Sequence, residues 1–141
     1  MAWGVEGEGA AALRFGGVDI VINTAAIYPM PDPGTPAEVV WGQALSINVT
    51  SNHVLAQEAN EVFEAQGLPA TIVLTSSANA VVPKRGSEPY DVSKAAINHL
   101  IRELAIGLGP NVRVNGIAPA TTRRLGPTPK NPPPSRRDAS E

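Results

Sequence analysis

Three short apolar runs, separated by two long segments with helical spacing, most constrain what this chain can fold into. The runs are residues 18–23, 70–75 and 112–117, and each is rich in β-branched or aliphatic side chains. Strands that are joined by helical crossovers run parallel, with right-handed connections. The sequence therefore predicts an α/β fold that holds part of a doubly wound parallel sheet, in the order strand, helix, strand, helix, strand.

The two helical segments have recognisable starts and one interruption. The first is predicted over about residues 36–66, with Thr35 as its N-cap and a proline at the first helical position. Poor helix formers around Asn48 predict a kink or two abutting helices within it. The second helix is predicted over about 88–108, where Ser87 is placed to cap the first turn.

The remaining residues divide the chain into three parts. Residues 1–17 are predicted to be weakly ordered, because their early glycines oppose a stable helix. Residues 18–125 hold all the predicted strands and form the domain. Residues 126–141 are rich in proline and polar residues, which predicts a disordered tail.

Composition excludes several classes of function. The chain has 141 residues, a net charge of −2 and no cysteine, so disulfides and cysteine-based sites are excluded and no affinity for nucleic acid is implied. His53 and His99 lie on predicted helices without companion ligands, so no metal site is predicted. No apolar run approaches the roughly 18 residues of a membrane span. These features favour a soluble, cytoplasmic protein.

The residues that indicate chemistry are Ser77, Tyr90 and Lys94. Tyr90 and Lys94 are four positions apart, which places them on one face of a helix. A Lys ammonium beside a phenol favours the phenolate, and a phenol tuned in this way can act as a general acid or base. Ser77 follows a predicted buried strand, where its hydroxyl could reach the same pocket.

In this order and at these intervals, the residues resemble those of the short-chain dehydrogenase/reductase family. The resemblance covers about residues 18–122 and implies a Rossmann-type fold. Asn48 is similar to the helix asparagine that helps to hold a proton-relay water. By this resemblance Ser77 would orient the substrate oxygen, Tyr90 would transfer the proton, and Lys94 would favour the phenolate and hold the nicotinamide ribose.

The same resemblance implies a cofactor, NAD or NADP, at the ends of the strands. The segment after the first strand is similar to the family's Asn-Asn-Ala-Gly, and the segment after the third is similar to its Pro-Gly motif. The residues implied to contact the cofactor are Asn23, Ala25, Ala26, Tyr90, Lys94, Pro119 and Ala120. In this family the two long helices, here 36–66 and 88–108, commonly form the subunit interface, which implies a homo-oligomer.

Two segments carry a narrower resemblance. Residues 77–84 and 90–94 are similar to the dehydrogenase part of bifunctional rhamnulose-1-phosphate aldolase/alcohol dehydrogenases. That likeness implies a small alcohol or aldehyde substrate, such as lactaldehyde.

The chain also departs from the family pattern. Thr24, Ala26 and Ala120 stand where the family usually has Asn, Gly and Gly, and no predicted strand precedes the glycines of residues 1–17. A dinucleotide site needs a glycine-rich turn between a strand and a helix. Three functions therefore stay open: an NAD(P)-dependent oxidoreductase that holds the catalytic half of the fold, a non-catalytic oligomerisation module, and an inactive truncated fragment of the family.

Overall fold

The computed structural model describes residues 5–120 and contains a parallel sheet of three strands. In chain order the elements are α1 (Val5–Phe15), β1 (Ile20–Asn23), α2 (Ala37–Leu45), a π-helical turn (Ser46–Thr50), α3 (Ser51–Gln66), β2 (Ala70–Thr75), a 3₁₀ turn (Ala78–Ala80), α4 (Glu88–Gly107) and β3 (Val112–Ile117). This order confirms the predicted α/β class. Within residues 5–120 no helix is both long and apolar enough to cross a membrane.

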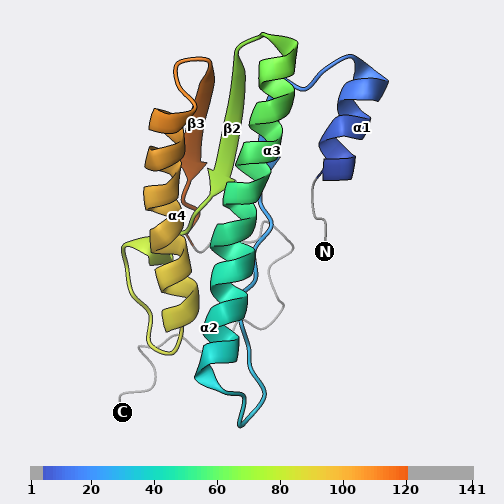
Figure 1. Ribbon diagram of the computed structural model, residues 1–141. Coiled ribbons are helices and arrows are strands. Elements are labelled where there is room, and N and C mark those ends of the chain that lie inside the picture. The colour runs from blue at the N-terminus through green and yellow to red at the C-terminus, as the bar shows by residue number, and fades with distance from the viewer. Residues whose placement is uncertain (1–4, 121–141) are drawn as a thin grey trace, which may run out of the picture.

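The strands lie in the order β1-β2-β3, and both pairs are parallel. Helices α3 and α4 lie in front of the sheet in the view of Figure 1, and α4 also contacts α2 and the π-helical turn. Alternate residues of β2 face this helical layer and are buried. The core between the layers consists of Ala56, Ala59, Phe63, Ala70, Ile72, Leu74, Ile97, Leu104, Val112 and Val114.

The opposite face of the sheet is open at β1. Ile20 and Ile22 are 60% and 63% exposed, although the continuous apolar run over residues 18–23 predicts a buried parallel strand. That prediction is wrong for β1, because side chains alternate along a strand and these two point away from α3 and α4. Gln66 at the end of α3 holds the entry to β1, since its amide bonds both the N–H and the carbonyl of Val18 at 2.6 and 2.8 Å.

The long first helix contains the predicted interruption, but its start differs from the prediction. The interruption is one π-helical turn, Ser46–Thr50, between α2 and α3. The N-cap is Pro36 rather than Thr35, whose hydroxyl donates to the Asp32 carbonyl at 2.8 Å. That bond closes the loop before the helix, and it leaves the first turn of α2 without a side-chain cap.

The N-terminal segment forms a helix earlier than its glycines predict. Helix α1 begins at Val5, contacts α3, and is followed by Gly16 at a φ of 86°. Its tertiary contact with α3 compensates for the poor helix propensity of glycine. The tail predicted over 126–141 lies outside the described residues.

Candidate active site

The carboxyl ends of the three strands meet at one edge of the sheet. Asn23 pairs with Leu74, and Thr75 pairs with Ile117, so β1, β2 and β3 end at neighbouring positions. The pairing continues past the strands, because the Ser76 N–H donates to the Ile117 carbonyl at 2.8 Å. Sites in open α/β sheets form beyond this edge. The structure therefore brings the predicted site segments together.

Tyr90 and Lys94 share one face of α4, as their spacing predicts. The Lys94 ammonium nitrogen lies 5.6 Å from the centroid of the Tyr90 ring. Only 2% of Lys94 is exposed, and its ammonium donates to the Thr75 carbonyl at 2.8 Å. Burial lowers the pKa of Lys94 from its ordinary value of 10.5, because desolvation penalises the charged form.

Ser77 is buried at the end of β2 and caps the 3₁₀ turn Ala78–Ala80. Its hydroxyl oxygen accepts a hydrogen bond from the Asn79 N–H at 3.2 Å. The side chain of Asn79 donates in turn to Asp91 Oδ1 at 2.7 Å, one residue after Tyr90. Ser77 is thus joined to the start of α4 by a short chain of hydrogen bonds rather than by a direct bond to the Tyr90 hydroxyl.

Asp91 fastens the loop before α4 to that helix. Besides Asn79, its carboxylate accepts the backbone N–H of Lys84 at 2.8 Å. Burial opposes ionisation of this carboxyl, but hydrogen bonds from Asn79, the Lys84 backbone and Ser87 favour the carboxylate, and their sum lowers the pKa of Asp91 below 3.8. An ionised, fully bonded carboxylate therefore sets the position of the residues around Tyr90.

Asn48 is fully buried in the π-helical turn and joins three segments. Its side chain exchanges two hydrogen bonds with the backbone of Ile27, at 2.8 and 2.9 Å, and donates to the Ser93 hydroxyl at 2.9 Å. Ser93 donates to the Tyr90 carbonyl at 2.7 Å. π-Helical turns often occur at functional sites. Here the turn places Asn48 so that it links the loop after β1 to the helix that carries Tyr90.

The residues implied to contact a cofactor lie around the same edge. Asn23 donates to Asn52 at 2.8 Å and accepts from the N–H of Ala25 at 3.0 Å, while Ala25 and Ala26 are exposed. Pro119 and Ala120 are exposed beyond β3, and the Pro119 carbonyl accepts the Ala78 N–H at 2.9 Å, just after Ser77.

These groups fit one end of a dinucleotide. An ammonium has three donors, and Lys94 directs one of them to Thr75, so two remain for ribose hydroxyls. The glycine-rich turn between a strand and a helix, which a pyrophosphate needs, is not found within residues 5–120. In that range Gly16 and Gly17 follow a helix and precede a strand. Among the described residues, Lys94 thus has donors that would suit a nicotinamide ribose, whereas a turn that would suit a pyrophosphate is not found.

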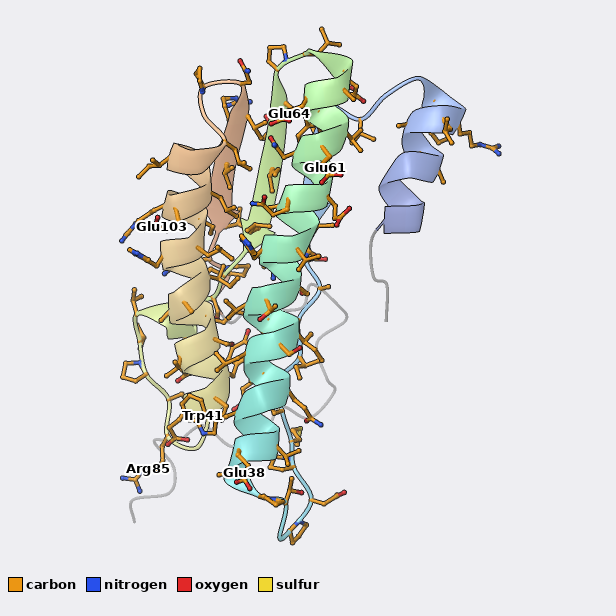
Figure 2. All side chains as sticks on the ribbon, viewed as in Figure 1. Glu38, Trp41, Glu61, Glu64, Arg85 and Glu103 are labelled. Atoms are coloured by element: carbon orange, nitrogen blue, oxygen red, sulfur yellow. The ribbon has the colours of Figure 1, made fainter. Side chains whose placement is uncertain are left out.

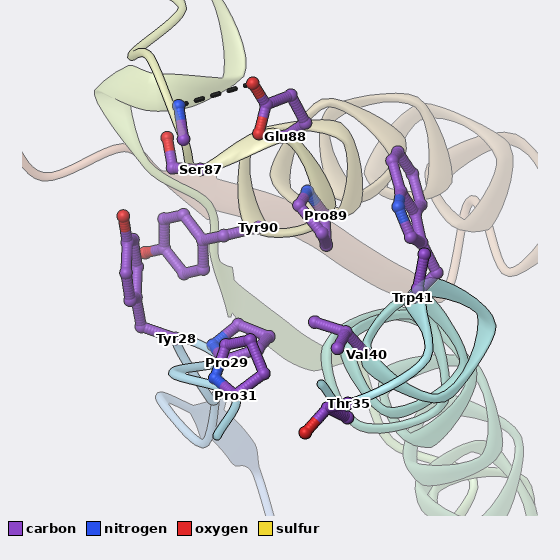
Figure 3. A pocket seen from close by; sticks show the side chains of 12 residues that line it. Tyr28, Pro29, Pro31, Thr35, Val40, Trp41, Ser87, Glu88, Pro89 and Tyr90 are labelled. Carbon is purple, nitrogen blue, oxygen red and sulfur yellow. Dashed lines mark hydrogen bonds between the residues drawn. The ribbon is translucent and has the colours of Figure 1, made fainter. Parts of the chain in front are cut away.

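A pocket opens beside Tyr90, between the N-terminal ends of α2 and α4 and the loop after β1. Its volume is about 460 Å³. Figure 3 shows Tyr28, Pro29 and Pro31 on one side and Val40 and Trp41 on another. The rings of Tyr28 and Tyr90 lie 4.9 Å apart between centroids, tilted by 50°. Trp41 and Arg85, from α2 and the loop before α4, lie toward the same end of the molecule in Figure 2.

Sequence reasoning did not identify Tyr28, Asn79, Asp91 or Ser93 as parts of this site. Ser93 stands next to Lys94 in the sequence, and its place on the buried face of α4 could have indicated it. Tyr28 and Asn79 lie in irregular loops, where no periodic pattern indicates which way a side chain points. His53 and His99 are exposed, and His99 pairs with Glu103 at 3.0 Å, as expected for surface residues.

Comparison with known proteins finds relatives named as dehydrogenases, reductases or oxidoreductases. The family model described as enoyl-(acyl carrier protein) reductase matches residues 9–134. Human "Dehydrogenase/reductase SDR family member 4" is 38% identical over 106 residues, which are 74% of this chain and 38% of that protein. An "Uncharacterized oxidoreductase" of Thermotoga maritima is 32% identical over 114 residues, 79% of this chain and 45% of that protein.

Solved structures agree with the fold. A putative short-chain alcohol dehydrogenase from Sinorhizobium meliloti superposes with a TM-score of 0.74 at 29% identity, covering 87% of this chain and 52% of that one. NADPH-dependent 3-quinuclidinone reductase from Rhodotorula rubra superposes at 0.71 with 31% identity, covering 86% and 47%. The chain spans roughly two fifths to one half of the length of the proteins that it matches.

Proposed function

The chain belongs to the short-chain dehydrogenase/reductase family, and we propose that it acts as an NAD(P)-dependent oxidoreductase on a small alcohol or aldehyde such as lactaldehyde. The observation that carries this proposal is the placement of Tyr90 and the buried Lys94 on one face of α4, at the edge where Ser77 lies just beyond the end of β2. A cofactor bound there would supply or accept the hydride.

In this reaction each residue has a distinct task. Tyr90 gives its phenolic proton to the oxygen of the substrate carbonyl, or accepts it in the reverse direction. The hydroxyl of Ser77, held by Asn79, orients that oxygen. Lys94 donates one hydrogen bond to the Thr75 carbonyl and keeps two donors for the ribose. Asn48 positions the loop after β1 against α4.

NADP(H) is the cofactor that we propose to test first, because one structural neighbour is named as NADPH-dependent. Purified chain is mixed with NADPH and lactaldehyde, and loss of NADPH absorbance is followed. We expect turnover by the wild-type chain and none by a variant that carries both Ser77→Ala and Tyr90→Phe. Absence of turnover with NADPH and with NADH, at saturating aldehyde, would contradict the proposal.

Self-association through the helical layer is a second proposal. Val92 and Ile106 lie on one stripe of α4 and are 46% and 80% exposed, and Val54 of α3 is 42% exposed. Exposed apolar stripes of this kind are typical of subunit interfaces. Light scattering after size exclusion should report a dimer or larger oligomer for the wild type and a monomer for Val92→Glu/Ile106→Glu. A wild-type monomer would contradict it.

A further inference from the structure

The pocket beside Tyr90 is large compared with a small hydroxyaldehyde. An apolar cavity of about 150 Å³ is enough to bind benzene, and this pocket has a volume of about 460 Å³. A three-carbon substrate at Tyr90 would leave most of that space to water. A substrate that carries a ring would displace that water from apolar walls, which favours binding.

The walls of the pocket are apolar and rigid. The rings of Pro29, Pro31 and Pro89 fix their φ angles, and Trp41 and Tyr28 present aromatic surfaces on opposite sides (Figure 3). Pocket walls of this kind need little ordering when a ligand binds, so little affinity is lost to entropy. Aromatic side chains also favour an aromatic ligand through offset or edge-to-face contacts.

The charges around the pocket disfavour an anionic ligand. Glu88 is the one charged residue among the described residues that line it, and its carboxylate accepts the Gly86 N–H at 3.3 Å (Figure 3). Helix N-termini attract anions, and both α2 and α4 begin here. However, Glu38 and Glu88 already occupy their first turns. The Lys84 ammonium lies near the pocket, but it sits over the Tyr28 ring, 5.7 Å from its centroid. A phosphate or carboxylate on the ligand would meet the Glu88 carboxylate in the lining, which favours an uncharged ligand.

The pocket is continuous with the proposed reaction centre. Tyr90 lines it, and the Tyr90 ring contacts that of Tyr28 at 4.9 Å between centroids. Figure 3 shows the Tyr90 hydroxyl at the end of the ring next to Tyr28, with Trp41 across the pocket. A carbonyl carbon within reach of that hydroxyl would therefore have its substituent beside Tyr28, and a bulky substituent would extend across the pocket toward Trp41.

We propose that this pocket selects uncharged carbonyl compounds and alcohols that carry an aromatic or similarly bulky apolar group, which Tyr28, Trp41 and the three prolines hold. The inference rests on the proposed oxidoreductase function and extends its substrate class beyond lactaldehyde. Trp41 is then a specificity-determining residue: it binds the substituent, and the reacting oxygen lies at Tyr90.

The test measures binding without turnover. Isotope-labelled chain is titrated with benzyl alcohol and, separately, with ethylene glycol, and the backbone amide and indole N–H resonances are followed. Benzyl alcohol should give saturable shifts at Gly86, Tyr90 and the Trp41 indole. Ethylene glycol should bind at least about tenfold more weakly, since it lacks the ring that the aromatic walls hold.

Two variants of Trp41 and one control sharpen the test. Trp41→Ala should lower the affinity for benzyl alcohol about tenfold. Trp41→Phe keeps an aromatic wall, so its affinity should stay within about twofold of that of the wild type. Leu68→Ala removes a 59% exposed leucine that does not line the pocket, and it should change nothing. The amide spectrum of each variant reports whether it is folded.

The outcomes separate the inference from the proposed function. Saturable benzyl alcohol shifts without any cofactor-dependent turnover would overturn the function and keep the pocket. Two results would overturn this inference: ethylene glycol bound as tightly as benzyl alcohol, or benzyl alcohol shifts that lie away from the pocket. If the chain still turns over lactaldehyde, the proposed function is kept.

Discussion

Helix α4 packs against its neighbours along its whole length, but its two halves are held in different ways. Toward its C-terminus, Ile97 and Leu104 lie in an apolar core with residues of α3 and the sheet. Toward its N-terminus, the buried residues are Asp91, Ser93 and Lys94, and each has hydrogen-bond partners.

The difference shows how one helix serves two purposes. Apolar contacts are non-directional, so the C-terminal half stabilises the fold without fixing any one atom. A buried polar group costs free energy unless its partners are in place, so the N-terminal half fixes the positions of Ser77, Tyr90 and Asn48. Substitutions in the C-terminal half should affect stability, and those in the N-terminal half should affect the site.

The largest expected effect comes from Tyr90→Phe in the polar half. Removal of the proton donor should lower kcat/KM by about a hundredfold to ten-thousandfold, the usual contribution of general acid–base catalysis. The free energy of unfolding should change by less than about 0.5 kcal/mol, because Tyr90 is partly exposed. Steady-state kinetics and chemical denaturation measure the two quantities. Retention of activity would assign the proton transfer to another group.

Phe63→Ala should show the opposite pattern. Phe63 is 2% exposed in the apolar core, so its truncation should lower the free energy of unfolding by roughly 3–5 kcal/mol. Under conditions where the variant is folded, its affinity for benzyl alcohol should match that of the wild type. A stability loss no larger than that of Leu68→Ala would contradict the role of the apolar half.

Asn48→Ala should lower both the stability of the fold and the order of the site, each to a smaller extent than the two preceding substitutions. It leaves the part-buried backbone N–H and carbonyl of Ile27 without their partner, which costs roughly 1–3 kcal/mol in all, since water can replace part of what is lost. Hydrogen exchange at the Ile27 amide should accelerate. Exchange at Ile72, in the centre of the sheet, should accelerate only as far as the loss in the free energy of global unfolding requires. Equal acceleration at the two amides would show that Asn48 has no local role.

The smallest expected effect is the pH dependence of Asp91. The pKa of its carboxyl is lowered in the folded chain, so its contribution is fully present above the unfolded value and is lost as pH falls through the folded value, below 3.8. The difference in unfolding free energy between the wild type and Asp91→Asn, roughly 1–3 kcal/mol near neutral pH, should shrink toward pH 3. A difference that does not change with pH would show that the ionised Asp91 carboxylate is not the source of the stabilisation.

The sequence predicted the fold and much of the site because both rest on local patterns. The β2 and β3 ranges match those predicted, and the Tyr90–Lys94 spacing gave their shared face. The exposure of Ile20 and Ile22 could not be predicted, since a continuous apolar run does not show which face the helices cover. The role of Asp91 depends on its hydrogen bond with the backbone N–H of Lys84, seven positions earlier in an irregular loop. No periodic pattern in the sequence predicts such a contact.

The sequence also could not show how some residues of the site are held in place. Asn48 could be read as a helix-breaking residue or as a functional one, and the structure shows a π-helical turn with a side chain that bonds two other segments. The pocket beside Trp41 forms only when the starts of α2 and α4 approach each other. Such features follow from tertiary packing rather than from spacing along the chain.

The measurement that tests the central claim most directly is a titration of NADPH fluorescence with the wild-type chain and with Lys94→Met. If the polar half of α4 holds the nicotinamide ribose, the wild type should give a saturable change, and Lys94→Met should bind at least about tenfold more weakly, since charged hydrogen bonds are lost. Chemical denaturation should show that the variant is still folded. No saturable change at millimolar NADPH or NADH, or equal binding by a folded Lys94→Met, would contradict the account.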